Sequence, residues 1–295
     1  MRNRLLFILA LASQLLWAQP DNMNWWNNRH NWDYVRSWSE YIEVQPGTMG
    51  PNALPVPELR NGEMDTNFTL LAAGEVHTAP NDFTANAFLS VNIPIKKTIS
   101  IQVWWVPFEY FETDTLVRDF RKARTWEAQG TSVGDVYIAT VIPLVQQKEK
   151  WPDILLGINL KTASGNNLEN ARFTDSPGYF FDVSFGKTYN LGESWTIRPH
   201  AMGGFYVYQT NRTDYFQNDC IMWGAGADVR SADWLFKVHV TGYAGYFGEY
   251  DQPAVIRLEA SRWFGRTRIL ARYQNGNDSF PWHTFRLGAE FRFGH

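Results

Sequence analysis

The chain has 295 residues and a mildly acidic formal net charge of -3, which argues against a nucleic-acid partner. Its single cysteine, Cys220, excludes an intramolecular disulfide and a metal site built from cysteines. The six histidines lie far apart in the sequence and match no metal-binding spacing. The sequence therefore predicts no metal, no cofactor and no nucleic-acid partner.

The first residues have the layout of a secretory signal peptide. Arg2 and Arg4 precede a short apolar run over residues 5–12, and the small residue Ala18 follows shortly after it. The run is too short for a membrane-spanning helix, which needs about 20 apolar residues. A buried N-terminal helix is the alternative. We expect export, with cleavage near Ala18 and removal of residues 1–18.

Residues 19–65 are rich in Trp, Asn and Pro and show no sustained alternation. Trp32 and Trp38 are too apolar for a free, solvated tail, and Pro51, Pro55 and Pro57 impose an extended run. One interpretation is a plug or constriction inside the domain that follows. The alternatives are a periplasmic cap packed against the short turns of that domain, or a segment that binds a periplasmic partner.

From residue 66 onward the chain breaks into about twelve runs in which apolar and polar residues alternate. A soluble strand is usually about five or six residues long, whereas these runs have the length that a tilted strand needs to cross a bilayer. The runs cover residues 66–78, 83–95, 98–112, 134–148, 153–164, 178–190, 194–208, 218–230, 234–248, 253–264, 266–275 and 282–294.

The connections between these runs alternate in length. Those after even-numbered runs are short, and those after odd-numbered runs include the long segments 113–133, 165–177, 209–217 and 276–281, with 79–82 and 249–252 as short exceptions. Outer-membrane barrels have this arrangement, with short periplasmic turns and longer outer loops. We therefore predict that residues 66–295 form an all-β, transmembrane, antiparallel up-and-down barrel whose two ends lie in the periplasm.

A soluble sandwich or lipocalin-like barrel is the alternative fold. Its core would need large side chains on the apolar face, and here that face often carries Ala or Gly, which would leave such a core loose but is acceptable against lipid. These positions include Ala201, Gly203, Ala225, Ala227, Ala260 and Ala289. The prediction is a location in the outer membrane of a Gram-negative cell, in contact with its lipid and lipopolysaccharide.

Gly134 and Asp135 open one predicted strand, and Lys161 and Gly165 lie where the next strand ends. With these residues, the segment from about residue 98 to 230 resembles the family of outer-membrane barrels named for the meta-pathway of phenol degradation. In that family a Gly-Asp opens a strand, a hairpin follows, and the next strand ends in a Lys-x-x-x-Gly region. The matching positions are Gly134, Asp135, Pro152, Lys161 and Gly165. The family usually has Pro-Thr-Gly where this chain has Thr-Ala-Ser-Gly at 162–165. The resemblance implies a transport role and no catalytic residues.

The last run, 282–294, has a defined direction in the predicted barrel. Its apolar residues at 285, 287, 289, 291 and 293 should face lipid, and the charged residues between them should face the lumen. An aromatic and basic C-terminus also resembles the signal by which the barrel-assembly machinery recognises its clients, although Gly294 and His295 follow the final aromatic residue, Phe293.

The same alternation predicts a basic stripe on the lumenal wall. The basic positions are Arg198, Arg230, Lys237, Arg257, Arg268, Arg272, Arg286 and Arg292, and the acidic positions are Glu75, Asp182, Asp228, Glu259 and Glu290. One interpretation is a salt-bridge network that fills a narrow barrel, with Arg257, Arg286 and Arg292 paired to Glu259 and Glu290. The other is a water-filled passage that favours anionic solutes.

These features predict a passive channel or uptake porin for small polar or anionic solutes. The alternative is a structural or assembly component that binds a periplasmic partner through residues 19–65. A lipid-modifying enzyme is a third class, for which a Ser184–His200 pair in the lumen or His283 at the outer rim are the candidates. Paired polar residues are expected inside any barrel, so we assign no catalytic residue.

Overall fold

The computed structural model of the protein describes residues 23–96 and 98–293. The predicted signal peptide lies outside the described residues. The chain divides into two compact units, 1–36 and 37–295. In the first, helix α2 (Asn24–His30) is followed by Trp32, whose ring lies 4.7 Å from that of Tyr34 and whose Nε1 donates to the Arg36 carbonyl at 2.9 Å. Trp32 belongs to this unit, so its predicted part in a plug remains a prediction.

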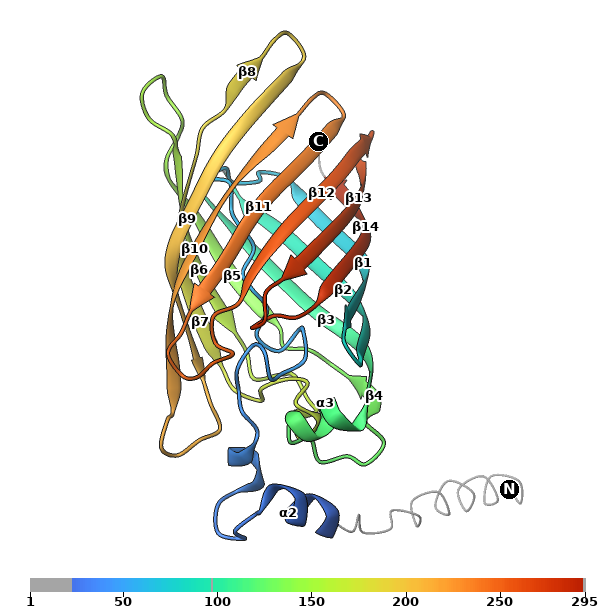
Figure 1. Ribbon diagram of the computed structural model, residues 1–295. Coiled ribbons are helices and arrows are strands. Elements are labelled where there is room, and N and C mark those ends of the chain that lie inside the picture. The colour runs from blue at the N-terminus through green and yellow to red at the C-terminus, as the bar shows by residue number, and fades with distance from the viewer. Residues whose placement is uncertain (1–22, 97, 294–295) are drawn as a thin grey trace, which may run out of the picture. The chain divides into compact units, whose positions relative to one another are not determined.

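The second unit is a closed barrel of twelve antiparallel strands (Figure 1). Each strand pairs with the next, and β14 pairs with β1 to close the ring. In chain order the strands are β1 (Phe68–Ala79), β2 (Asp82–Ile95), β3 (Ile99–Thr113), β5 (Tyr137–Val145), β6 (Asp153–Lys161), β7 (Gly178–Gly186), β9 (Trp195–Gln209), β10 (Gln217–Arg230), β11 (Trp234–Ala244), β12 (Ala254–Phe264), β13 (Thr267–Gly276) and β14 (His283–Phe293).

The predicted barrel is confirmed, and each of the twelve runs corresponds to one strand. Two short additions were not predicted: β4 (Gln129–Ser132) pairs with β3, and β8 (Tyr189–Leu191) extends β9 as a hairpin. Within the segment expected to be a loop, Asp114 caps helix α3 (Thr115–Phe120) through its side chain, which accepts from the Val117 N–H at 2.8 Å. Short 3-10 turns, η1 (Trp38–Tyr41) and η2 (Leu168–Asn170), complete the elements.

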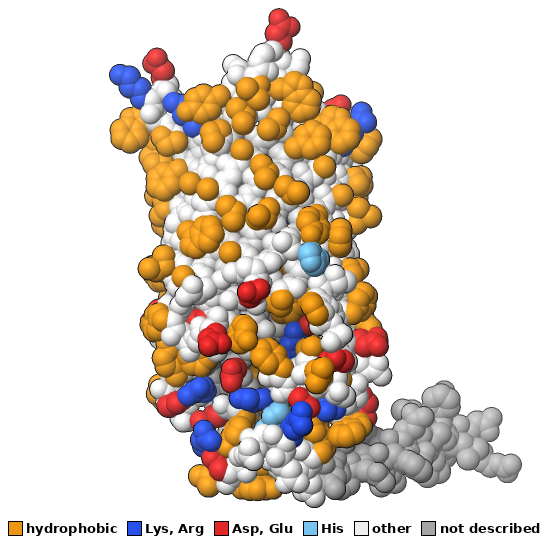
Figure 2. All heavy atoms as spheres, in the orientation of Figure 1, with side chains coloured by type: hydrophobic (Ala, Val, Ile, Leu, Met, Phe, Trp, Pro, Cys, Tyr) orange, Lys and Arg blue, Asp and Glu red, His pale blue; other side chains and the backbone are white. Residues whose placement is uncertain are grey.

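The outer surface of the barrel wall is apolar, as the alternation requires. Leu287 is 67 % exposed and Ile221 is 71 % exposed, and other large apolar side chains lie outward along most strands. Figure 2 shows these side chains spread over the wall between its two ends. A continuous exposed apolar surface of this kind is typical of contact with lipid. Among the described residues, no helix is long and apolar enough to span a membrane.

The two ends of the barrel differ. At one, which we call the short-turn end, lie the tight connections at 96–98, 231–233 and 265–266 together with the start of β1 and the end of β14. At the other, the long-loop end, lie the connections at 114–136, 162–177, 210–216, 245–253 and 277–282. This distribution agrees with the predicted alternation of connection lengths.

Residues 38–50 lie against the long loops. The Glu43 carboxylate lies 2.8 Å from the Lys122 ammonium, the Gly50 N–H donates to the Ala171 carbonyl at 2.8 Å, and Met49 is fully buried beside Ala171. The Arg124 guanidinium lies over the ring of Trp38, with its Cζ 4.6 Å from the ring centroid. Residues 38–50 therefore pack at the long-loop end and not against the short turns, whereas for residues 23–36 the cap remains a prediction.

The long-loop end also contains a buried carboxyl group, that of Asp251 in the connection between β11 and β12. It accepts hydrogen bonds from the Tyr208 hydroxyl at 2.7 Å, the Asn218 amide at 2.5 Å and the Phe247 backbone N–H at 3.0 Å. Burial raises the pKa of Asp251 above its ordinary value, and these hydrogen bonds offset only part of that effect.

The raised pKa gives a pH-dependent contribution to stability. The folded carboxyl holds its proton more tightly than the unfolded one, so this contribution declines as pH rises from about 4 through the raised folded pKa, and is constant above it. We expect Asp251→Asn to gain stability relative to the unsubstituted protein as pH rises above about 4, measured by urea unfolding in detergent. A stability difference that does not change with pH would contradict this assignment.

Candidate functional site

The candidate functional site is the lumen, through which residues 51–65 pass. Side chains or carbonyls of this segment contact at least nine of the twelve strands, which is possible only for a segment inside the barrel. The contacts are Asn52 with Asn86 and Glu109, Leu54 with Tyr243, Val56 and Pro57 with Arg257, Glu58 with Arg272, Arg60 with Asn159 and Asp182, Asn61 with Arg198 and Asp228, Glu63 with Arg230, and Asp65 with Asn92.

The proline content of this segment explains how it is held. Pro55 and Pro57 lie in an extended chain, whereas Pro51 lies in a turn closed by the Ala53 N–H on the Gly50 carbonyl at 3.1 Å, so the predicted extended run is wrong at Pro51. All three prolines remove backbone donors, so the segment offers carbonyl acceptors to the wall. Arg257 supplies the donors: its Nη2 lies 2.6 Å from the Val56 carbonyl oxygen and its Nη1 lies 3.0 Å from that of Pro57. Because Arg257 is buried and always charged, these bonds hold the backbone firmly.

The Glu58 carboxylate of the segment is paired with an arginine of the wall. Glu58 accepts two parallel hydrogen bonds from Arg272, at 2.6 Å from Nη1 and 3.0 Å from Nη2. The Arg272 Nε lies 3.2 Å from the wall carboxylate of Glu259, and Arg257 Nη1 lies 4.0 Å from Glu58. Arg272 is thus shared between a carboxylate of the wall and a carboxylate of the segment.

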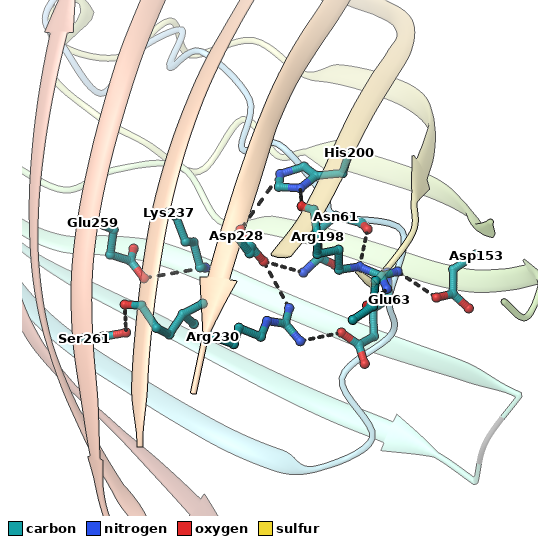
Figure 3. A network of polar contacts seen from close by, with 12 residues as sticks. Asn61, Glu63, Asp153, Arg198, His200, Asp228, Arg230, Lys237, Glu259 and Ser261 are labelled. Atoms are coloured by element: carbon teal, nitrogen blue, oxygen red, sulfur yellow. Dashed lines mark hydrogen bonds and ion pairs between the residues drawn. The ribbon is translucent and has the colours of Figure 1, made fainter. Parts of the chain in front are cut away.

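A second set of pairs lies nearer the short-turn end (Figure 3). Asp228 of β10 accepts from the Asn61 amide at 2.8 Å and from Arg230 at 3.0 Å, and Arg230 also binds Glu63 at 2.7 Å. On the neighbouring strand β9, Arg198 lies 2.7 Å from the Asp153 carboxylate.

Two glycines let the segment lie directly on the wall there. Gly62 has a φ of +83°, and a Cβ on it would meet the backbone of Gly186. A Cβ on Gly186 would in turn meet the Asn61 carbonyl. The close approach of the segment to β7 therefore depends on both residues having no side chain.

The predicted basic stripe lies on the lumenal side of the wall, but none of the three expected arginines pairs with Glu259 or Glu290 among the described contacts: Arg257 binds the carbonyls of Val56 and Pro57 and lies 4.0 Å from Glu58. Arg286 pairs with Glu75 at 2.6 Å, not with Glu259 or Glu290. Arg292 lies over the ring of Trp263, 3.6 Å from its centroid. The remaining pairs are Arg268 with Glu290 and Glu259, Lys237 with Glu259, and Arg60 of the segment with Asp182. Some charged residues of the wall are thus paired with residues of the 51–65 segment, and the alternation pattern of the strands does not predict such pairs.

A cavity of about 390 Å³ remains beside the segment, lined by it and by the wall. The described wall residues that line it include five basic and four acidic side chains, and the segment adds three acidic and one basic. The wall groups are Lys237, Arg257, Arg268, Arg272, Arg286, Glu75, Asp135, Asp228 and Glu259, and the segment groups are Glu58, Glu63, Asp65 and Arg60. The segment therefore offsets the positive excess of the wall.

Near the long loops, the side of the lumen formed largely by β7, β9, β10 and β11 is apolar, which we did not predict. Val44, Leu54 and Val56 pack there against inward-facing aromatic and sulfur-containing side chains. These are Tyr137, Phe180, Met202, Tyr206, Tyr208, Cys220, Met222 and Tyr243. The parity of each strand contains the signal, since residues 202, 206 and 208 share a face with Arg198.

The residues that carry the family resemblance form a structural tie. The Asp135 carboxylate lies 2.7 Å from the Lys161 ammonium and accepts from the backbone N–H groups of Ser164 and Gly165 at 2.9 and 2.7 Å. Both charged side chains are fully buried. These contacts fix the end of β6 and the start of the 162–177 loop to Asp135, just before β5.

The candidate Ser184–His200 pair does not form. His200 Nδ1 lies 2.9 Å from the Arg198 carbonyl oxygen, and the Ser184 hydroxyl has no hydrogen-bond partner among the described residues. His283 is exposed and bonds to the Tyr273 hydroxyl at 2.8 Å. Within the part of the chain that the structure describes, no group of three or more His, Cys, Asp or Glu residues could hold a metal ion.

Solved structures with the same architecture include two outer-membrane proteins. An outer membrane channel from Pseudomonas putida F1 superposes with a TM-score of 0.56 at 11 % identity, over 81 % of this chain and all of that chain. The fold is that of an outer-membrane barrel. The NanC porin superposes with a TM-score of 0.50 at 11 % identity, over 76 % of this chain and all of that one. No protein-family model and no curated protein matches the sequence.

Proposed function

We propose that this protein is a passive outer-membrane channel for small polar or anionic solutes, in which residues 51–65 form the constriction. The observation that carries the proposal is the closed barrel whose polar, charged lumen holds this segment beside a cavity of about 390 Å³. A lumen lined by charged side chains in a low-dielectric wall selects solutes by charge and by width. The channel and porin folds of the similar structures support this proposal, as does the transport role implied by the family resemblance.

The proposed location is the outer membrane, reached after export and cleavage near Ala18. The apolar outer face of the strands supports it, because a surface of this kind is stable only in contact with lipid. The amphipathic β14 supports recognition by the barrel-assembly machinery. Lipid and lipopolysaccharide are then the surroundings of the wall.

The selectivity of the channel is expected to depend on the carboxylates of the segment. In the double variant Glu58→Gln, Glu63→Gln, the partners Arg272 and Arg230 lose the negative charges that face them. We expect the reversal potential in a planar bilayer under a KCl gradient to move towards the chloride side relative to the unsubstituted protein.

The matched control is Glu112→Gln, which removes one charge from an exposed position of β3 that does not line the cavity. It should leave the reversal potential unchanged. A shift of the double variant towards potassium, or an equal shift in the control, would refute anion preference as a property of the wall.

A further inference from the structure

The contacts of the segment differ in how readily they can be exchanged. Arg60 pairs with the fully buried Asp182, and the Val56 and Pro57 carbonyls are bound by the buried Arg257. Glu58, by contrast, has a side chain that is 51 % exposed, and it lines the cavity. Its carboxylate can therefore leave Arg272 more readily than the buried contacts can separate, and its departure removes one of the ties that hold the segment to the wall.

When Glu58 leaves, the Arg272 guanidinium can bind another carboxylate through two parallel hydrogen bonds. Arg272 presents Nη1 and Nη2 at 2.6 and 3.0 Å from the two Glu58 oxygens, while its Nε is held by Glu259 at 3.2 Å. A guanidinium fixed in this way binds a planar carboxylate through two parallel hydrogen bonds. Exchange with a solute breaks one such pair and forms one, and it leaves the Glu58 carboxylate unpaired in the cavity that its half-exposed side chain already lines.

An independent observation at the same place is an unpartnered polar side chain. His239 lines the cavity, is only 5 % exposed, and its Nε2 has no hydrogen-bond partner among the described residues. His239 lies directly opposite Arg257 in the β11–β12 pairing. A buried polar atom without a partner is costly, and a ligand that supplies one removes that cost.

We propose that Arg272, together with Arg257 and His239, forms a binding site for the carboxylate of a small organic acid, and that Glu58 occupies this site as a built-in competitor. The inference rests on the proposed function only in that solutes must reach the lumen. It adds the chemical class of the ligand and a way in which that ligand loosens the constriction. The cavity volume of about 390 Å³ is sufficient for such an acid.

The test uses the full-length protein in detergent with succinate as the probe and succinamide, which has the same shape and no charge, as its control. We expect succinate to speed hydrogen–deuterium exchange in peptides covering residues 52–60, and succinamide to have no effect. Glu58→Gln should bind succinate about tenfold more tightly by calorimetry, because a tethered competitor at millimolar effective concentration is gone. Arg272→Gln should lose binding.

Glu112→Gln is the control, since it removes one negative charge from an exposed position of β3 that does not line the cavity. It should bind succinate as the unsubstituted protein does. Equal tightening in both variants, or no effect of succinate on exchange, would overturn the inference. Glu58→Asp keeps the negative charge on a shorter side chain, and it should bind succinate with an affinity between those of the unsubstituted protein and Glu58→Gln. This second variant keeps the test valid if Glu58→Gln does not fold. Succinate binding without conductance would refute the channel and leave the site, whereas conductance without succinate binding would refute the site alone.

Discussion

Removing residues 19–60 is expected to raise the single-channel conductance of the refolded barrel severalfold. The described part of this stretch includes Pro51, Pro55 and Pro57, which line the cavity, and the side chains of Glu58 and Arg60, which bind opposite walls. Because the strands close among themselves through β1 and β14, the wall does not need the segment to complete its hydrogen bonds. Conductance in planar bilayers, with folding checked by heat-modifiable gel mobility, measures the effect.

This deletion also separates the channel from the docking alternative. A plug that is removed leaves a wider lumen, whereas a docking segment that is removed leaves conductance unchanged and abolishes capture of a periplasmic partner. Arg257→Gln gives a milder form of the same test, since it removes the charged donor to the Val56 and Pro57 carbonyls while keeping the full chain. Unchanged conductance in both variants would refute the constriction.

Arg172→Ala is expected to lower the free energy of unfolding by about 3–5 kcal/mol, the usual cost of leaving one charge of a buried pair unmatched. Arg172 and Glu109 are both fully buried, with Arg172 Nε 2.8 Å from the Glu109 carboxylate and Nη2 2.9 Å from the Thr84 hydroxyl. After the substitution, Glu109 retains the Asn52 amide at 2.7 Å and loses the charge opposite it. Urea unfolding in lipid vesicles, followed by tryptophan fluorescence, measures the loss.

Arg212→Ala is the control for this prediction. Arg212 pairs with Asp214 in an exposed connection, where the side chains are 37 % and 66 % exposed, so the loss should be less than about 1 kcal/mol. Similar losses of stability in the two variants would show that burial does not determine how much the Arg172–Glu109 pair contributes to the free energy of unfolding. A double variant in which Glu109 is also replaced by alanine should recover part of the stability.

The sequence by itself determined the barrel wall. Alternation with a period of two over ten or more residues assigns each side chain to one of two faces, and it did so for most strands, including the outward Phe285 and Leu287 and the inward Arg286. A bulge in the β2–β3 pairing reverses the parity within β3, so Glu109 lies inward and Phe108 outward, which strict alternation does not predict. Alternating connection lengths then predicted that the long connections gather at one end of the barrel. Both signals are local, so neither depends on which distant residues meet.

The tertiary structure alone decided what fills the lumen. Residues 19–65 have no periodicity, and the alternatives for them differ only in where they lie, so the course of 51–65 through the barrel could not be predicted. The same holds for the partners of the basic stripe: Arg272 binds Glu58 and Arg230 binds Glu63, pairs that are far apart in the chain. Strand parity shows that an arginine points inward, but its partner depends on the register of the closed ring and on the segment threaded through it, which are long-range properties.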